Sequence, residues 1–474
     1  MNVEWLSYLP AWLRRELYFS LQTLIGSRIR SVWKEFLSWE KMNAAELEKA
    51  VDEKLSRVLE AAIRDSAYYR RMNLPRQPGE TARQWLKRFP ILERSLVREN
   101  FTSIVTDALR GQIPSPEVQS PRRYSWLIVK TGGTTGSPTT VVHDARTRDW
   151  GRVTRLYGLR QCGFPLGNPY IKLWGSERDL HHQEAALQQR VLTALHKELP
   201  LNAFRSREED LRKHLDVIKA HPEIQHLMAY VDAAAGMALY IQENKLRAPQ
   251  FKTMMACAGT VTAEFRELLE KTFSTDVFDK YGSRDCCDLA CECRYHKGLH
   301  IYSPQAVIEI ADEQGRECPP GKTGRILVTL LNNFSFPMIR YSIGDMGTWA
   351  PPGPCPCGLP FPRLESIQGR QDDMLRTEDG TLQSSTFVRH FVGVALNRQL
   401  IREWQLEQTG AKEFIFRYVP LNKEGLEENL KQLQESFRKV LGNSSHIEMR
   451  SVDEIPPSSS GKMRWIINRS GAGP

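Results

Sequence analysis

Several features that would place a protein in a specialised class are missing from these 474 residues. No run of about 18 apolar residues is present, so no membrane-spanning helix is predicted. No block of Lys and Arg is interleaved with aromatic residues, which argues against nucleic-acid binding. Only nine cysteines occur and nothing suggests export, which argues against a disulfide framework. Internal repeats are absent, and low-complexity sequence is limited to residues 458–460 and 471–474. We therefore expect a globular protein of the cytoplasm.

The overall amino-acid composition suits a multidomain protein that binds a phosphorylated ligand. Apolar residues make up 41% of the chain, enough to bury more than one core, and the length predicts about two to four domains. The 65 basic residues exceed the 56 acidic ones, and the resulting net charge of +9 is spread along the chain. A diffuse positive charge is compatible with ligands such as ATP or coenzyme A (CoA).

A segment rich in glycine and threonine follows the apolar run 126–129 and is the most informative part of the sequence. Its glycines let the backbone fold around an anion with N–H groups pointing inward, and its hydroxyls add uncharged donors. No Lys follows the last glycine, which excludes the kinase and GTPase type of phosphate loop. The segment alone predicts, with about even weight, a phosphate-binding loop or a hairpin turn between two strands. The residues concerned are Thr131, Gly132, Gly133, Thr134, Thr135 and Gly136.

A second segment carries residue types that a nucleotide site needs. Tyr281, Gly282 and Ser283 follow an expected strand at 275–280, so they should lie at the sheet edge where open α/β proteins bind ligands. The tyrosine ring can cover adenine. The carboxylate of Asp285 can hold magnesium on a triphosphate. The alternative is an ordinary turn after a strand.

Three further charged residues follow in turns. Asp345 comes directly after a glycine, and its carboxylate can accept both hydroxyls of a ribose. Arg370 precedes two carboxylates in a sharp turn. Lys462 lies on a loop of Ser and Gly, where a point charge can reach a reacting phosphate. Each residue alone also fits an ordinary role, as a strand-end Asp, a salt-bridged Arg or a solvated Lys.

In this order the segments resemble the signature set of the adenylate-forming superfamily, which contains acyl-CoA synthetases, luciferases and nonribosomal peptide adenylation domains. The resemblance runs from about residue 40 to about residue 468. It is closest to the phenylacetate-CoA ligase family and its capsule-biosynthesis relatives. The likeness to that family lies in helical segments at 44–49 and 61–70, an acid-pocket segment at 229–240, and a pattern of Cys and His after Asp285.

The resemblance implies an α/β fold with a large body and a small domain. The body, residues 41–371, would contain α/β sheets and a strand-rich subdomain, with short strands around 300–350. The small α+β domain, residues 372–474, would be mobile about Asp372 as its hinge. Residues 1–40 would form an aromatic, basic helical arm. We expect this arm to dock on its own domain or on a second subunit of a homodimer, with peripheral membrane contact as the weaker alternative.

The resemblance also implies a reaction and its ligands. ATP and Mg²⁺ would activate a carboxylic acid to an acyl-adenylate with release of pyrophosphate, and a thiol, most simply CoA, would then take the acyl group. Lys462 and Asp285 would be the catalytic residues, while Asp345 and Arg370 would fix the ribose. The acid would be aryl or otherwise small and apolar. Candidates for contacting it are Tyr230, Ala258 and Gly259.

Sulfur and imidazole side chains after Asp285 match the ligands that zinc prefers. By resemblance to zinc-bearing relatives we assign a structural Zn²⁺ site to Cys293, His300, Cys355 and Cys357, with His296 as the substitute for His300. The alternative is that reduced cysteines pack as small hydrophobic residues. For Cys286, Cys287 and Cys291, packing is the favoured interpretation.

Two departures from the family pattern leave other functions open. Arg284 and Asp285 stand where a Thr-Glu pair is usual, and residues 379–387 lack the usual sequence of the ligases. The acceptor is then CoA or, alternatively, an amine, a sugar or a carrier protein in polysaccharide or natural-product biosynthesis. A third alternative is a catalytically silent homologue that acts as a binding protein. The polar set around Asp345 and Lys462 argues against it, because a scaffold does not need these residues.

Overall fold

The computed structural model describes most of the chain. The described residues are 6, 9–121, 125–131, 139–175, 191, 194–195, 198–203, 208–370, 375–378, 382–383, 400–422, 424–456 and 465–469. Among them, no helix is both long enough and apolar enough to cross a membrane.

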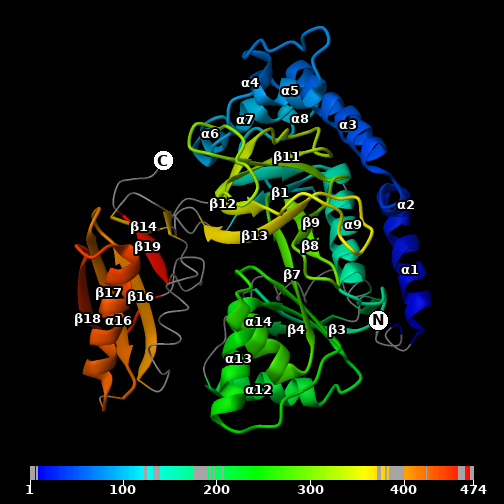
Figure 1. Cartoon of the computed structure of the whole chain (residues 1–474). Coiled ribbons are helices and arrows are strands. Elements are labelled where there is room, and N and C mark those ends of the chain that lie inside the picture. The colour runs from blue at the N-terminus through cyan, green and yellow to red at the C-terminus, as the bar shows by residue number, and fades with distance from the viewer. Residues whose placement is uncertain are drawn as a thin grey trace.

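Helices dominate the first part of the chain and cover one side and one end of the body (Figure 1). The longest, α3, begins at Asn43, whose side chain accepts from the Glu46 N–H at 3.0 Å while the Glu46 carboxylate accepts from the Asn43 N–H at 2.9 Å. This capping box satisfies two N–H groups at the helix end. The helices are α1 (Ala11–Leu24), α2 (Ile29–Trp39), α3 (Ala44–Asp65), α4 (Ala67–Arg70), α5 (Ala82–Lys87), α6 (Arg94–Glu99), α7 (Phe101–Ile104) and α8 (Asp107–Arg110).

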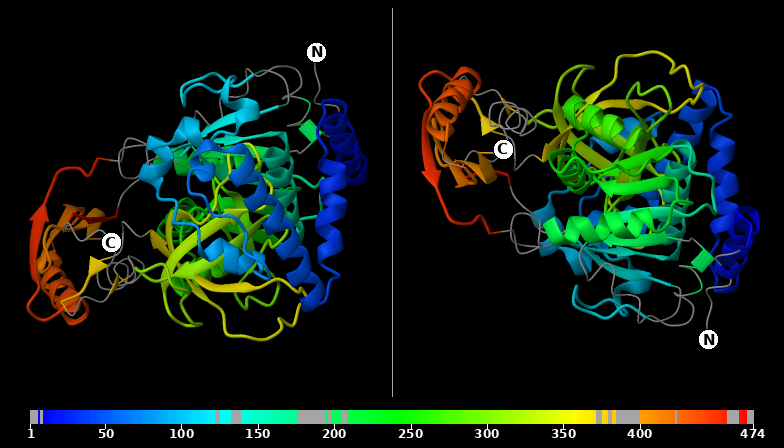
Figure 2. Two further views of the ribbon diagram at one scale, coloured as in Figure 1. Left: turned by 90° about the horizontal axis from the view of Figure 1, so that it is seen from above. Right: turned by 90° about the horizontal axis from the view of Figure 1, so that it is seen from below.

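The N-terminal arm packs on the chain's own body. Asp149, on the buried face of α9 (Ala145–Gln161), accepts from the Arg28 N–H at 2.8 Å and from the Ser27 hydroxyl. Arg14 Nε donates to the Gly167 carbonyl at 3.1 Å. Figure 2 shows α1 and α2 running along one flank of the body, beside α9. The arm is therefore part of the folded body in this structure.

An eleven-stranded sheet forms the centre of the body, in the order β10-β11-β12-β13-β9-β8-β7-β6-β5-β3-β4. The half from β4 to β7 is parallel, and the half from β7 to β10 is antiparallel. The strands are β3 (Tyr170–Trp174), β4 (Glu198–Asn202), β5 (His226–Tyr230), β6 (Thr253–Cys257), β7 (Asp276–Ser283), β8 (Cys287–Glu292), β9 (Leu299–Ile301), β10 (Ala306–Ala311), β11 (Gly324–Leu330), β12 (Tyr341–Trp349) and β13 (Arg363–Arg370). A separate hairpin pairs β1 (Leu127–Lys130) with β2 (Thr140–His143).

Alternate residues of the parallel strands enter two different cores. Met254 and Val277 pack in the core that α12 (Glu208–Lys219), α13 (Val231–Glu243) and α14 (Ala263–Phe273) cover. Their neighbours Met255 and Phe278 pack in the core that holds α9 and the N-terminal helices. Successive side chains of a strand point to opposite faces, so strands buried on both faces must be apolar throughout. This explains the apolar run at 254–257 in β6.

The C-terminal part has its own sheet and core. Its four strands run in the order β18-β17-β16-β19, and one helix, α16 (Leu426–Leu441), packs Leu433 and Phe437 against Phe416 and Ile447. Figure 1 shows this unit beside the body. The strands are β16 (Ile401–Gln408), β17 (Glu413–Pro420), β18 (His446–Ser451) and β19 (Ile466–Asn468), and a further short pair joins β14 (Leu375–Arg376) to β15 (Leu382–Gln383). The predicted fold class is confirmed. The boundary at 371–372 lies outside the described residues and stays a prediction.

Lys54 of α3 carries a buried positive charge that should show in the pH dependence of stability. Its Nζ lies 2.9 Å from Glu35 Oε1 and 3.8 Å from the ring centroid of Trp150. Burial lowers the pKa of Lys54 from 10.5 to about 8, although Glu35 opposes the shift. The folded state thus binds this proton less tightly than the unfolded state, and stability should rise as pH increases between these two values.

We expect Lys54→Met to lose this dependence. Between pH 7.5 and 9.5 the wild-type free energy of unfolding should gain about 2 kcal/mol more than that of the variant, from the difference between the two pKa values. Urea denaturation at both pH values measures this gain. Lys49→Met, at an exposed position of the same helix, is the control. Equal pH slopes for wild type and Lys54→Met would contradict the assignment.

Candidate active site

The ends of three parallel strands bring several predicted residues to one edge of the sheet. Tyr230 ends β5 and is paired in register with Cys257, which ends β6 and precedes Ala258 and Gly259. The next strand along the sheet, β7, carries Tyr281 and ends at Ser283. The carboxyl edge of parallel strands is where open α/β sheets bind ligands.

Asp345 is the centre of a hydrogen-bonded group at this edge. Its Oδ2 accepts from the Tyr281 hydroxyl at 2.9 Å, and its Oδ1 lies 3.2 Å from Arg370 Nε. The second contact follows from register, because Asp345 of β12 is paired directly with Arg370 of β13. Burial raises the pKa of Tyr281 well above its ordinary value, and the neighbouring Asp345 carboxylate adds to the shift. The phenol therefore stays protonated and keeps donating to Asp345.

The turn after β7 is held by its own side chains. Asp285 is buried, and its carboxylate accepts from the hydroxyls of Ser283 and Tyr341, the latter at 2.6 Å. The Ser283 hydroxyl in turn accepts from the Cys286 N–H at 3.1 Å. Magnesium binding by Asp285 would have to compete with these bonds, so the geometry favours a role in shaping the turn.

The predicted phosphate loop connects β1 to β2, and hydrogen bonds join its two ends, whereas the far end of this hairpin contacts the turn after β7. At its base, the Thr131 N–H donates to the Thr139 carbonyl and the Thr139 N–H donates to Thr131 Oγ1, both at 2.9 Å. His143, at the end of β2, places Nε2 2.9 Å from the backbone oxygen of Asp285. Burial lowers the pKa of His143, which keeps the ring neutral. The five predicted loop residues Gly132, Gly133, Thr134, Thr135 and Gly136 lie outside the described residues.

The candidate acid-binding residues lie next to an aromatic pair. The ring of Tyr230 is 4.6 Å from the ring of Trp174, which ends β3. Ala258 and Gly259 are both exposed, and Ala258 has φ +60°. A Cβ at Gly259 would come within 3.3 Å of Val231 Cβ, so the backbone passes closely over the start of α13.

Four predicted zinc ligands converge in the strand-rich half of the body. The ligand atoms of Cys293, His300, Cys355 and Cys357 all lie within 4.8 Å of one another. The sulfurs of Cys293 and Cys355 are 3.6 Å apart, and Cys357 Sγ is 3.3 Å from His300 Nε2. Two sulfurs on a tetrahedral zinc at about 2.3 Å would be about 3.8 Å apart, so the spacing fits this metal.

The protonation states in this cluster also suit a metal. Burial lowers the pKa of His300 to about 4, so the imidazole is neutral and has a lone pair for ligation. Burial works against ionisation of Cys355, but hydrogen bonds from the Cys357 backbone and from the thiols of Cys357 and Cys293 lower its pKa below the ordinary value. His296 lies apart from the four, with Nδ1 3.1 Å from Glu292 Oε2.

Comparison with known proteins gives relatives over most of the chain. Residues 375–469 match the family model of the CapK C-terminal domain. The phenylacetate-coenzyme A ligase of Thermus thermophilus is 28% identical over 192 residues, which is 36% of this chain and 43% of the ligase. Protein CapK of Staphylococcus aureus is 21% identical over 387 residues, which is 81% of this chain and 80% of CapK.

The fold recurs in a solved structure of 2-hydroxyisobutyryl-CoA ligase in the postadenylation state, in complex with R3-HIB-AMP. The TM-score is 0.67 at 18% identity, with 91% of both chains covered. Together, the relatives and the shared fold support the adenylate-forming superfamily. The match to the Thermus ligase spans less than half of that enzyme.

One cation near Asp345 was missed in the sequence. Arg94, the first residue of α6, donates to the Ile343 carbonyl, which also accepts from Arg370 Nη1 at 3.3 Å. A Cβ at Gly344, where φ is +80°, would lie 3.1 Å from Arg94 Cζ. Among the described residues, Arg94 Nε is buried without a hydrogen-bond partner. No sequence signal marks Arg94, because it is one Arg among many in a polar helix far from the motifs.

A buried charged cluster beside Trp174 was also missed. Lys172 and Lys280 each place Nζ 5.8 Å from the centroid of the Trp174 ring. Lys172 pairs with Glu198 at 3.1 Å, and Lys280 pairs with Asp288. Two paired lysines therefore lie against the same Trp174 ring that Tyr230 contacts.

Two predicted residues of the C-terminal domain, the hinge Asp372 and the catalytic Lys462, lie outside the described residues. Their roles stay predictions. Described residues on either side of Lys462 belong to the C-terminal unit, since Ile455 is buried and Ile466 of β19 packs in its core.

We expect purified protein to contain about one zinc per chain, because four ligands of the right type and spacing complete a tetrahedral site. Cys355→Ser should lower the zinc content and the melting temperature, while Cys318→Ala, at a buried cysteine outside the cluster, should keep the metal. Elemental analysis of protein never exposed to chelator makes the measurement. Full-length protein without zinc would overturn the site.

Proposed function

We propose that this protein activates a carboxylic acid with ATP to form an acyl-adenylate, releases pyrophosphate, and then passes the acyl group to a thiol, most simply CoA. The acid that we propose is a small aryl or otherwise apolar one. Relatives named as CoA ligases, among them the phenylacetate-coenzyme A ligase, support this class of reaction.

The observation that carries the proposal is the hydrogen-bonded group at Asp345. A carboxylate oriented by a phenol and a guanidinium can accept both ribose hydroxyls of a nucleotide. Tyr281, Asp345 and Arg370 come from three different strands, and they meet near the turn after β7, which contacts His143 of the hairpin that carries the phosphate loop at its other end. A binding protein without nucleotide chemistry has no need of this arrangement.

The proposed roles follow from where charge develops. The acid and the triphosphate are both anions, so their repulsion must be offset before the carboxylate oxygen attacks the α-phosphorus and pyrophosphate leaves. Backbone N–H groups of the loop at 131–136 would hold the departing phosphates, and Lys462 would stabilise the charge that builds in the transition state. Arg94, which shares the Ile343 carbonyl with Arg370, would add a second fixed positive charge near Asp345. Magnesium, when bound with ATP, would supply further charge compensation.

Zinc has a structural role in this proposal. Cys293 follows β8, His300 lies in β9, and Cys355 and Cys357 lie in the loop between β12 and β13. A metal there would link the end of β8, β9 and the β12–β13 loop, all parts of the sheet that also carries Asp345 and Arg370. It would thus stiffen the site without contacting the substrates.

A second acceptor class is favoured by one observation. Residues 375–469 match the CapK C-terminal domain, and protein CapK covers most of the chain. In the alternative, the same adenylate would pass to an amine, a sugar or a carrier protein in polysaccharide or natural-product assembly. The adenylation step and its residues would be unchanged.

The test is product analysis with ATP, a panel of acids and CoA as the first acceptor. The proposal predicts AMP and pyrophosphate together with an acyl-CoA thioester. AMP formation that needs acid and hydroxylamine but ignores CoA would favour the second acceptor class. Release of ADP and phosphate in place of AMP would contradict the proposal altogether.

A further inference from the structure

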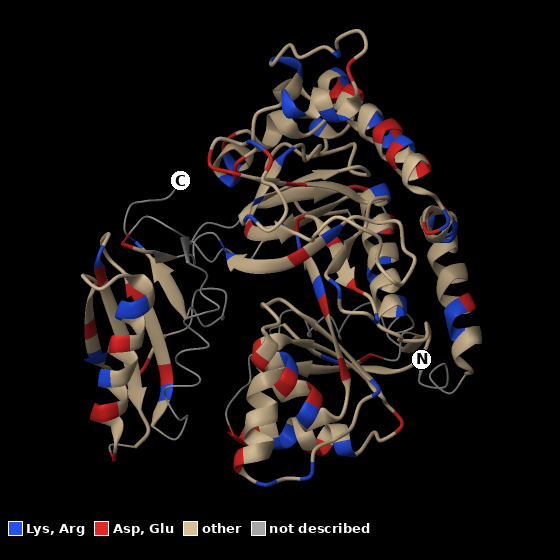
Figure 3. Ribbon diagram, viewed as in Figure 1, with Lys and Arg blue, Asp and Glu red and all other residues tan. Residues whose placement is uncertain are grey.

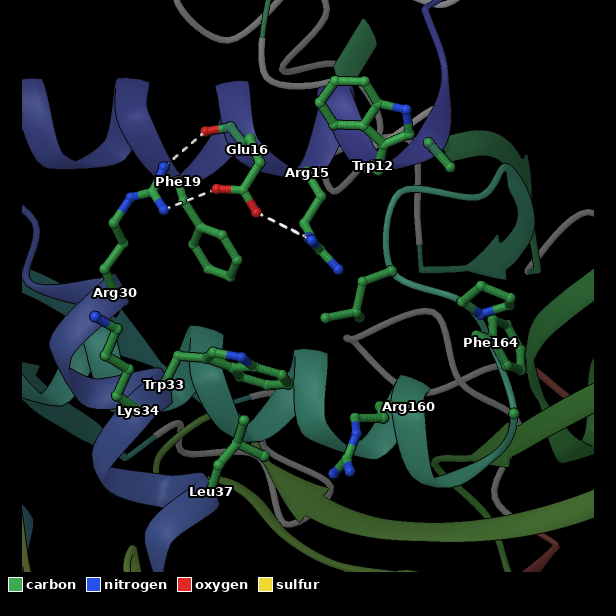
Figure 4. A pocket seen from close by; sticks show the side chains of 14 residues that line it. Trp12, Arg15, Glu16, Phe19, Arg30, Trp33, Lys34, Leu37, Arg160 and Phe164 are labelled. Atoms are coloured by element: carbon green, nitrogen blue, oxygen red, sulfur yellow. Dashed lines mark hydrogen bonds and ion pairs between the residues drawn. The ribbon is translucent and has the colours of Figure 1, made fainter.

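A groove between the N-terminal arm and the body has a volume of about 760 Å³. It is formed by α1, α2, the end of α9 and the loop that follows, and none of its residues belongs to the candidate active site. Figure 4 shows side chains from α1 pointing across the groove toward those of α2 and α9. The lining consists of Ala11, Trp12, Arg15, Glu16, Phe19, Arg30, Trp33, Lys34, Leu37, Arg160, Gly163, Phe164, Pro165 and Leu166.

The walls of this arm groove are apolar and aromatic. Phe19 is 4% exposed and packs 6.3 Å from the ring of Trp33, so both rings are fixed. Trp12 at the rim is 61% exposed, an unusual state for the largest apolar side chain. Apolar walls of this volume are typical of sites that bind small organic molecules, which usually measure about 300–1,000 Å³.

The polar side chains of the arm groove are mostly cations. Arg15, Arg30, Lys34 and Arg160 face a single carboxylate, Glu16, in the lining. Glu16 binds Arg30 at 2.8 Å and Arg15 at 3.1 Å (Figure 4). Its charge is thus shared between two guanidinium groups, and the groove keeps an excess of positive charge. Figure 3 shows acidic and basic residues mixed over the fold.

Two of these cations differ in whether they already form an ion pair. Arg160 pairs with Glu40 at 2.8 Å, outside the lining. Lys34 is exposed, and within the described part of the chain no hydrogen bond or ion pair engages its side chain. A ligand anion would give Lys34 a partner without breaking an existing ion pair.

We propose that the arm groove binds an amphipathic anion, a phosphate monoester with a hydrocarbon or aryl body. The body would lie on Phe19, Trp33 and Leu37, and the phosphate would lie near Lys34 and the arginines. A flat membrane surface fits less well, because the cations and rings line a concave groove between two helices and cannot all touch a plane.

Hexyl phosphate is a suitable probe, since it stays monomeric in water at the concentrations needed. Calorimetric titration of the full chain should show saturable binding that weakens with added salt. Inorganic phosphate and hexanol should each bind at least about tenfold more weakly, because each lacks one half of the ligand chemistry. Saturating ATP should leave the affinity for hexyl phosphate unchanged, which separates this groove from the nucleotide site and from the function proposed above.

Two charge reversals distinguish binding in the groove from attraction by the net charge of the protein. Lys34→Glu should weaken hexyl phosphate binding about tenfold or more, because an attraction becomes a repulsion at close range. Lys213→Glu, at an exposed position of α12, changes the net charge equally and should have no effect. Melting temperatures check that both variants fold. No binding by wild type, or equal binding by wild type and Lys34→Glu, would overturn the proposal. Binding to vesicles of phosphatidylglycerol without binding of hexyl phosphate would replace it with a membrane surface.

Discussion

Asp345→Asn should raise the KM for ATP about 30- to 100-fold in acid-dependent adenylation while kcat changes much less. The carboxylate can accept both ribose hydroxyls, whereas an amide offers one acceptor and places an N–H₂ group against Arg370. Losing a charge-assisted hydrogen bond of this kind costs about 2–3 kcal/mol. The ribose does not change during the reaction, so the loss falls on ground state and transition state alike and appears in KM.

Two matched variants test this interpretation. Tyr281→Phe removes only the hydroxyl that lies 2.9 Å from Asp345 Oδ2 and should have a smaller effect than Asp345→Asn. Glu365→Gln neutralises an exposed carboxylate on β13 and should change nothing. An Asp345→Asn enzyme with wild-type KM for ATP would remove Asp345 from the nucleotide site.

Lys462→Ala should reduce kcat for adenylation about 10²- to 10³-fold and leave the KM for ATP nearly unchanged. The reason is that the lysine charge is needed only as negative charge builds between the acid and the α-phosphate. Single-turnover formation of acyl-adenylate, followed by quenching and AMP analysis, measures the step. The contrast with Asp345→Asn separates a residue that binds the nucleotide from one that acts on the transition state.

The control for this variant is Lys431→Ala, at an exposed position of α16 in the same unit. It removes an equal charge and should keep full activity. Circular dichroism should show that Lys462→Ala stays folded. If Lys462→Ala adenylates at the wild-type rate, the proposed mechanism is wrong.

The fold was largely predictable because each element's residue pattern reflects its surroundings. Helix α16, for example, has apolar positions that recur every three or four residues, a pattern that predicts an amphipathic helix. The apolar run 254–257 lies in β6 and is buried on both faces. The residue pattern could not predict the order of the eleven strands. Strand order depends on which distant segments pair, and the local sequence of a strand does not specify its partner.

The candidate site was predictable where chemistry restricts the residue type. Sulfur and imidazole are the ligands that zinc prefers, and the resemblance to zinc-bearing relatives named the four-residue cluster before its geometry was known. Spacing could not choose between His300 and His296. The choice follows from β9, which carries His300 toward the loop at 355–357, while His296 turns to Glu292.

Residues whose role depends only on their position in the folded structure could not be recognised in the sequence. Arg94 reaches Ile343 from a helix about 250 residues earlier in the chain, and Lys172 and Lys280 meet at Trp174 from two separate strands. An arginine in a polar helix and a lysine in a strand are ordinary in sequence. Their importance depends on burial, which only the folded chain defines.

The most direct test of the central claim is exchange of labelled pyrophosphate into ATP, measured across a panel of aryl and aliphatic carboxylic acids. This exchange reports reversible formation of an acyl-adenylate and does not require the acceptor to be known. Our account predicts exchange that depends on the acid, is strongest with one chemical class, and is suppressed in Lys462→Ala. Absence of exchange with every acid, in zinc-loaded protein that binds ATP, would contradict it.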